Sequence, residues 1–489
     1  MLSMTSIRTD PGILHSLVRA AWILLAASVL RFIYRAQRGP LARLPGPEIS
    51  KWTGAVMIYH WLTGQGVDYV AHLHDKYGPV VRVTPDHADF ADLSALKEIH
   101  RVGGRFVKSD FYRRLVPFGT NVFAQTDPRL HASRRRLLAS PISDSSLRTF
   151  EDVVNARVVF ALDQAAGEMR QRGVADMFKW WLFMATDIIG ELSFGESFKM
   201  LEHGEKNQYS SDLEQLASFQ PFRTTFPTLV KLASHLSLPF FGKIAAAGRR
   251  IGQYSQASID RYRALLQRTD EKAPQTLFSK IWADKELTPD DIRSEAQGYI
   301  VAGSDTTAVT LTYLVYNVCQ DERVRQRLLE ELASLPTDFR DADVRNLPYL
   351  DQVVTETLRL NAPVAASLER TAPPEGARLA GYDIPGGVIV STQAYTLHRS
   401  KKIFEDPHKF NPDRWRTPSA EMKDSMMPFG GGARRIHLAK MELRLATARF
   451  FTRFPATRLS RQDGMSEKDM EQVHFFLMAP RGHRLLVEL

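Results

Sequence analysis

A single cysteine, Cys319, is the feature that most restricts what this 489-residue chain can fold into. With one thiol the chain forms no intramolecular disulfide, and it has neither a CxxC redox motif nor a cysteine-rich zinc or iron–sulfur site. Its stability must come from a hydrophobic core, for which 44% hydrophobic and 24% charged residues are ordinary values. Because proteins matured in oxidising compartments more often carry paired cysteines, we expect most of the chain to face a reducing cytosol.

The excess of positive charge is modest and scattered. Lys and Arg number 64 against 55 Asp and Glu, and the formal net charge is +9. The densest basic spots are Arg134 to Arg136 and Arg434 to Arg435, and neither extends into a basic run with interleaved aromatic residues. We therefore expect no nucleic-acid partner, and expect small molecules and a membrane instead.

An apolar stretch near the N-terminus predicts a membrane anchor. The chain carries no charge between Arg19 and Arg31, and the apolar pattern covers residues 13–34 if both arginines lie near the ends of a helix, where they can reach the interface. Basic residues follow this stretch, so the positive-inside rule keeps the next domain cytosolic. A cleaved signal peptide is the alternative, because the uncharged core has the length of an h-region.

The rest of the chain is predicted to be a mainly α fold with a small β portion. Residues 35–50 form a basic, Pro-rich hinge, and residues 51–489 form one large domain without repeats or a convincing linker. Hydrophobic periodicity predicts helices around 66–77, 126–139, 151–172, 176–196, 246–268, 289–334, 349–360 and 438–453. Short strands are expected at 80–83, 378–384 and 388–392, the last two joined by a hairpin-like turn.

Several common catalytic signatures are missing from the sequence. It has no HExxH, GxSxG, GxxxxGK[ST] or strand-linked GxGxxG, which argues against zinc peptidases, α/β-hydrolases, P-loop proteins and dinucleotide-binding domains. Four other motifs occur instead, in a fixed order.

The first motif is AGSDTT, from Ala302 to Thr307, inside a long apolar helical pattern. Gly303 weakens the helix and Thr306 can bond back to a carbonyl, so we expect a local defect with room for a small ligand or water. Asp305 and Thr306 together are what proton delivery to a buried oxygen species needs. A solvated polar patch at a helix end is the alternative.

The second and third motifs are expected to cooperate. Glu356 and Arg359 share one helix face, and their apolar surroundings favour a buried pair over an ordinary surface pair. A buried pair needs further partners, and Arg414 of the FNPDRW motif can supply one. The fourth motif, PFGGGARR from Pro428 to Arg435, is a glycine-rich loop whose backbone can approach a flat ligand; a flexible surface loop is the alternative.

The ordered set AGSDTT, ExxR, FNPDRW and PFGGGARR resembles the cytochrome P450 family of haem-thiolate monooxygenases. The resemblance covers the whole chain, including the anchor, the Pro-rich hinge and an early HxxxR formed by His131 and Arg135. It implies the cytochrome P450 fold, haem b as cofactor, and electrons from NADPH through NADPH–cytochrome P450 reductase. It also implies a hydrophobic small-molecule substrate and a single-pass anchor in the endoplasmic reticulum membrane.

The resemblance also implies roles for individual residues. Asp305 and Thr306 match residues that deliver protons to iron-bound oxygen, and Glu356, Arg359 and Arg414 match a structural triad. The positions that match cofactor-binding residues are His131, Arg135, Arg370, Phe429, Gly432 and Arg434. Of these, His131, Arg135 and Arg370 resemble the partners of the haem propionates, for which the two-pronged arginine side chain is well suited.

The fourth motif departs from the family pattern FxxGxxxCxGxxLA. Phe429 and Leu438 are nine positions apart (438 − 429), against twelve in the pattern, so a Cys-x-Gly triplet is missing between Arg435 and Ile436. The missing cysteine is the fifth ligand of the iron, and its thiolate favours O–O cleavage. Cys319 is more simply a small core residue, and His437 could act as a substitute ligand only if the loop rearranged.

Two explanations of the missing triplet belong to different functional classes. In the first, the protein is an active monooxygenase and this sequence carries an in-frame loss, such as a misplaced splice boundary. In the second, the chain is a catalytically inactive, membrane-tethered protein that binds haem weakly or binds only a hydrophobic ligand. The style of the motifs is similar to fungal secondary-metabolism members, so an aromatic polyketide of the aflatoxin or sterigmatocystin type is the expected substrate. The apolar stretch 219–247 lies where the family has its substrate lid.

Overall fold

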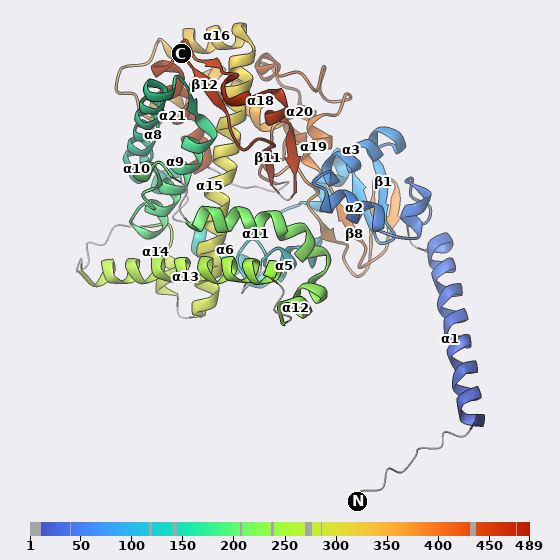
Figure 1. Cartoon of the computed structure of the whole chain (residues 1–489). Helices are drawn as coiled ribbons and strands as arrows, with labels where there is room; N and C mark the ends of the chain where they lie inside the picture. Colours follow the sequence, from blue (N-terminus) through green and yellow to red (C-terminus); the bar gives the residue numbers. More distant parts are fainter. Residues whose placement is uncertain are drawn as a thin grey trace, which may run out of the picture.

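The computed structural model describes residues 11–489 except residues 40, 117–119, 140–143, 206–207, 236–238, 269–275, 285, 431–436 and 476. Helices dominate this part of the chain, and short strands form small sheets, so the predicted mainly α fold with a small β portion is confirmed (Figure 1). The helices are α1 Pro11–Arg38, α2 Ala55–Leu62, α3 Gly66–Tyr77, α4 Leu93–Ile99, α5 Phe111–Leu115, α6 Pro128–Ala139, α7 Asp144–Leu147, α8 Glu151–Arg172, α9 Met177–Phe194, α10 Met200–His203, α11 Gln208–Thr225, α12 Pro227–His235, α13 Pro239–Arg268, α14 Ser279–Ala283, α15 Pro289–Gln320, α16 Glu322–Leu332, α17 Asp341–Val344, α18 Pro348–Leu360, α19 Ala394–His398, α20 Ala420–Ser425 and α21 His437–Arg453.

Local capping chemistry fixes the ends of the long central helix α15. Thr288 accepts a hydrogen bond from the backbone of Asp291, and the Asp291 side chain accepts one from the backbone of Thr288, which forms a capping box. The predicted continuous helix over 289–334 is wrong at one point, because Asp321 has an extended backbone. Its carboxylate accepts hydrogen bonds from the amides of Arg323 and Val324, so a second helix, α16, begins there.

The strands pair differently from the sequence-based prediction. They are β1 Val80–Thr84, β2 His87–Phe90, β3 Val107–Lys108, β4 Ala175–Asp176, β5 Arg370–Thr371, β6 Ala377–Leu379, β7 Tyr382–Ile384, β8 Ile389–Ser391, β9 Arg458–Leu459, β10 Gln472–His474, β11 Met478–Pro480 and β12 Leu486–Glu488. One sheet has the order β1-β2-β8-β5-β3 and another the order β4-β12-β9. The predicted hairpin between 384 and 388 is wrong: β7 pairs with β6, whereas β8 pairs with β2 and β5.

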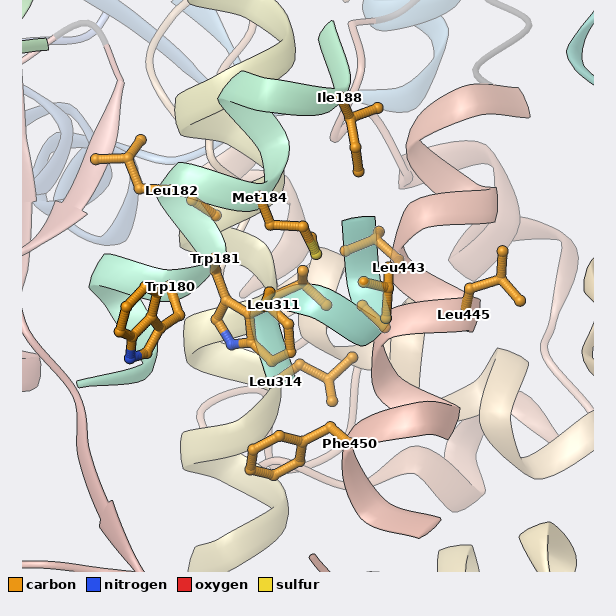
Figure 2. Packing of buried hydrophobic residues seen from close by; sticks show 14 of the residues in the cluster. Trp180, Trp181, Leu182, Met184, Ile188, Leu311, Leu314, Leu443, Leu445 and Phe450 are labelled. Atoms are coloured by element: carbon orange, nitrogen blue, oxygen red, sulfur yellow. The ribbon is translucent and has the colours of Figure 1, made fainter. Parts of the chain in front are cut away.

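The main hydrophobic core lies where α9, α15 and α21 meet (Figure 2). Helix α9 is apolar around most of its circumference, as expected for a helix enclosed by others. Trp181 of α9 is fully buried, and its ring meets that of Phe450 of α21 edge to face at 5.8 Å. Leu311 and Leu314 of α15 belong to the same core. These contacts hold rigidly the helix that carries the AGSDTT motif.

Helix α1 extends away from the body (Figure 1). It exposes large apolar side chains, among them Trp22, Ile23, Leu24 and Leu30. Within the described residues, none of the helices is both long and apolar enough to cross a membrane. The membrane-spanning segment expected at 13–34 therefore stays a prediction.

The segment just after α1 is tied to the body by one buried arginine. The Nη1 group of Arg82, on β1, donates to the carbonyls of Leu41 at 2.8 Å and Leu44 at 3.1 Å, and its Nε donates to Ser50 Oγ at 3.1 Å. Both leucines are buried in a core that includes β2 and β8. Part of the predicted hinge is thus bound to the body through hydrogen bonds and apolar packing.

Candidate active site

The AGSDTT motif lies on the middle of α15, where Asp305 and Thr306 are half-buried. Thr306 Oγ1 donates to the carbonyl oxygen of Ala302 at 2.7 Å, the back-bond expected from the sequence. The backbone is nevertheless α-helical throughout Pro289–Gln320, so the back-bond of Thr306 does not interrupt the helix where a local defect was expected. Gly303 has a packing role, because a Cβ atom there would lie 2.7 Å from Ile189 Cγ1 of α9.

A buried carboxyl group lies beside the same motif. Thr307 Oγ1 donates a hydrogen bond to Glu442 Oε2 of α21 at 2.9 Å. Burial raises the pKa of Glu442 to about 8, although the bond from Thr307 opposes this shift. Sequence reasoning missed this pair, since 135 positions separate the two residues and neither spacing nor periodicity connects them.

The structure brings the ExxR and FNPDRW motifs together in a buried cluster. Glu356 Oε1 accepts from Arg359 Nη2 at 2.8 Å and from Arg414 Nε at 3.0 Å. Glu356 Oε2 accepts from Arg359 Nε and from Trp415 Nε1, both at 2.8 Å. Glu356 and Arg359 are fully buried, so each charge needs such partners to offset its desolvation.

The donors of Arg359 that do not reach Glu356 also find acceptors. Its Nη1 donates to the carbonyls of His398 at 2.6 Å and Pro407 at 2.7 Å, and Nη2 donates to that of Lys409. These carbonyls belong to α19 and to the loop before Pro412–Trp415, so one side chain fixes the path of two segments.

Arg370 on β5 is a candidate anion-binding side chain. It is half-buried, and its Nη1 donates to Tyr112 Oη at 3.1 Å and to the carbonyl of Glu369 at 2.8 Å. Lys108 lies on the neighbouring strand β3, and its ammonium group is 5.5 Å from the centre of the Tyr112 ring. Tyr112 and Lys108 were not predicted from the sequence, because no motif marks them.

The other predicted propionate partners lie on α6. His131 is half-buried there, and the side chain of Arg135 is exposed. Burial raises the pKa of Tyr299 on α15, and the positive charge of Arg135 partly opposes this shift, so the two side chains interact electrostatically. Among the contacts that the structure records between described residues, none joins these two side chains to Arg370.

A neighbour of Arg135 connects α6 to the first half of α15. Arg134 Nη2 pairs with Asp291 Oδ1 at 2.6 Å, and Nη1 lies 3.5 Å from Glu295 Oε1. Glu295 is buried, which raises its pKa to about 7 against the effect of Arg134. In the sequence the three arginines at 134–136 are equivalent, and only the packing distinguishes the structural Arg134 from the exposed Arg135.

The glycine-rich loop is described only at its start. Phe429 is half-buried against the main core, and Gly430 has a φ of 91°, which favours glycine. Gly432, Arg434 and the junction between Arg435 and Ile436 lie outside the described residues. After them, α21 begins at His437, which is half-buried.

Cys319 is not placed for iron ligation. It follows Thr306 by 13 positions on α15, which corresponds to about 20 Å along a helix. Burial raises the pKa of its thiol to about 12, so the group is neutral and packs against the main core. These observations favour the interpretation of Cys319 as a small residue that packs against the core.

Comparison with known proteins identifies the class. The sequence model of the family "Cytochrome P450" matches residues 45–487. The chain is 49% identical to cytochrome P450 monooxygenase tazI of Aspergillus terreus, over 97% of this chain and 99% of that protein. It is 45% identical to cytochrome P450 monooxygenase orf2 of Aspergillus niger (99% and 100% covered) and 32% identical to aflV of Aspergillus parasiticus (96% and 95%).

The chain therefore belongs to the cytochrome P450 family, and it is a haem-dependent monooxygenase by family and by its fungal relatives. The side chains present fit the carboxylate end of haem, because Arg370 and the exposed Arg135 are cations with donors available for an anion. They do not supply the cysteine thiolate that usually binds the iron. The one cysteine of the chain, Cys319, is far along α15 from the AGSDTT motif, and its thiol is buried and neutral.

Proposed function

We propose that this protein oxidises a hydrophobic secondary metabolite, by hydroxylation, desaturation or rearrangement, and that an aromatic polyketide intermediate of a mycotoxin-type pathway is the first candidate substrate. The observation that carries this proposal is an aromatic wall where α11 meets α2 and α5. Trp61 of α2 packs edge to face on Phe111 of α5 at 5.8 Å, and its Nε1 donates to Thr224 Oγ1 of α11 at 3.3 Å. On another face of α11, Phe222 and Phe226 form a second aromatic pair, with ring centres 5.2 Å apart. Flat apolar rings are favourable neighbours for a fused aromatic substrate.

We assign the polar residues of the candidate site to positioning and proton transfer. Haem, when bound, supplies the oxidising chemistry that the side chains lack. His131, Arg135 and Arg370 would hold its propionates, and Asp305 and Thr306 would hold and pass protons on the middle of α15. The cluster of Glu356, Arg359 and Arg414 would keep the surrounding segments in place without touching the substrate. Phe429, Gly432 and Arg434 are proposed to line the cofactor.

We further propose attachment to the endoplasmic reticulum membrane through residues 13–34, with residues 35–50 as the connection and 51–489 as the cytosolic catalytic domain. The apolar side chains exposed on α1 support this, and so do Leu229 and Leu232, which are 50% and 60% exposed on α12. A hydrophobic substrate dissolved in the bilayer would then enter from that side. Electrons would come from NADPH through cytochrome P450 reductase.

A ligand-binding protein without oxidase activity is the second candidate function, because the chain's cysteine cannot provide the axial thiolate. A carbon monoxide difference spectrum of the reduced, full-length chain separates the two. A Soret band at the thiolate position supports oxidation by this sequence, and its absence, together with ligand binding, supports the second function.

The substrate proposal has its own experiment. A chain with Cys-x-Gly inserted between Arg435 and Ile436 is expressed with a reductase and supplied with the intermediates that accumulate when the gene is deleted in its host. Conversion of an aromatic polyketide supports the proposal, and conversion of another compound class alone overturns it. The same insertion with Ser in place of Cys is the matched control.

A further inference from the structure

The guanidinium of Arg223, on α11, is partly buried and pairs with no carboxylate of the described residues. Its Nη2 donates to the carbonyl of Leu115, at the end of α5, at 2.6 Å, and this is the only hydrogen bond that the described residues provide. Its Nε is buried without an acceptor, and no carboxylate of the described residues pairs with it. Loss of hydration lowers the pKa of the guanidinium to about 10.

Among the described residues, Arg293 and Arg325 also have a buried Nε without an acceptor, but each of them pairs with a carboxylate, Asp290 at 3.1 Å and Glu322 at 2.5 Å. Three further enclosed arginines have several partners. Arg359 pairs with Glu356 and several carbonyls, Arg444 pairs with Asp341 at 2.7 Å, and Arg82 uses both ends of its guanidinium on carbonyls. A buried donor without an acceptor costs about 1–3 kcal/mol, and more when it is charged. Arg223 therefore differs from Arg293 and Arg325 because its buried Nε has no acceptor and no carboxylate of the described residues pairs with its guanidinium.

The surroundings of Arg223 are aromatic and positively charged. Its neighbour in sequence, Thr224, accepts from Trp61 Nε1 through its hydroxyl and from Arg114 Nη1 through its carbonyl, the latter at 3.2 Å. Asp110, which directly precedes α5, pairs with Arg113 at 3.7 Å and not with Arg223. The local charge is therefore positive beside the aromatic wall.

We propose that Arg223 is a specificity-determining residue that binds a carboxylate carried by an otherwise aromatic substrate. Nε and Nη2 lie along one edge of a guanidinium, and such an edge matches the two oxygens of a carboxylate. The rings of Trp61 and Phe111 would receive the apolar part of the same molecule. This inference rests on the proposed function, because it assigns a substrate class to the aromatic wall between α2, α5 and α11.

A pair of fluorescent probes tests the inference without catalysis. 9-Anthracenecarboxylate and 9-anthracenemethanol share one ring system and differ in charge, and each is titrated into the full-length chain in detergent. We expect the carboxylate to bind about tenfold more tightly. Arg223→Gln should abolish this preference and leave the affinity for the alcohol unchanged, and Arg223→Lys should keep part of it.

The control is Arg249→Gln, which removes an exposed charge from the neighbouring helix α13 and should leave the preference intact. Equal binding of the two probes by the unaltered chain, binding of neither, or a preference that survives Arg223→Gln would each overturn the inference. Unchanged binding of the alcohol shows that the variant is folded. The carbon monoxide spectrum and substrate conversion report on the proposed function, so failure of one proposal is read separately from failure of the other.

Discussion

Thr307 donates a 2.9 Å hydrogen bond to the buried carboxyl of Glu442, and this bond connects α15, which carries the AGSDTT motif, to α21. The carboxyl is enclosed by the helices of the main core, where a charge is poorly solvated. Its protonated form is therefore favoured in the native protein.

Glu442→Gln should change how stability depends on pH. The pKa of Glu442 is about 8 in the folded chain and near the ordinary 4.5 in the unfolded chain, so unfolding releases a proton between these values. The stability of the unaltered chain should fall across pH 4.5 to 8 by up to about 1.4 kcal/mol per pH unit from this group, and then level off. Gln does not titrate, so urea unfolding at pH 5, 6.5 and 8 should show a widening advantage for the variant. Parallel pH profiles would contradict the prediction, and exposed Glu330→Gln is the control.

Gly303→Ala should destabilise the protein by about 1–3 kcal/mol, because the new methyl group would lie 2.7 Å from Ile189 Cγ1. Thermal unfolding measures the loss, and adding Ile189→Ala should relieve the clash and make the two effects non-additive. Gly252→Ala in α13 is the matched control, since its Cβ would meet no atom within 4 Å. That change should stabilise the helix by up to about 1 kcal/mol. Equal effects of the two glycine substitutions would show that α9 does not constrain α15.

Glu356→Ala should cost about 3–5 kcal/mol, since it leaves the fully buried charge of Arg359 without its carboxylate. Arg414 and Trp415 would lose an acceptor as well. Denaturant unfolding of the full chain measures the change, with Glu330→Ala on the surface of α16 as the control. A loss below about 1 kcal/mol would mean that the cluster is solvated like a surface ion pair.

Arg82→Met should release the segment after α1 from the body. Met keeps much of the apolar length of the side chain and removes the donors to the carbonyls of Leu41, Leu44 and Pro47. Trypsin should then cleave after the exposed Arg43 much faster, and stability should fall by about 2–4 kcal/mol. Arg378→Met, at an exposed position of β6, should change neither measurement. An unchanged cleavage rate in the Arg82 variant would show that packing of the leucines alone holds the segment.

Sequence periodicity predicted helix positions well wherever a helix has one apolar face. The predicted helix at 151–172 coincides with α8, and 349–360 differs from α18 by one residue. The strands were harder, because stretches of two or three residues carry almost no period. The pairing of β8 with β2, 302 positions earlier (389 − 87), depends on contacts between distant segments. Asp321 is a residue type that favours the N-cap of a helix, so the sequence does contain a signal for the end of α15 and the start of α16. The apolar pattern continues across this position, and the prediction therefore treated the two helices as one.

By itself, the sequence determined the class of fold, the ordered motifs and the restriction that one cysteine imposes, because these depend on residue types and spacings along the chain. The tertiary structure alone decided which polar groups share a buried environment. Burial and partner choice depend on segments that meet only after folding. For this reason Glu356 accepts hydrogen bonds from Arg414 and Trp415, 58 and 59 positions away, in addition to those from Arg359. Gly303 is likewise required by a side chain of α9, and Arg223 pairs with no carboxylate of the described residues.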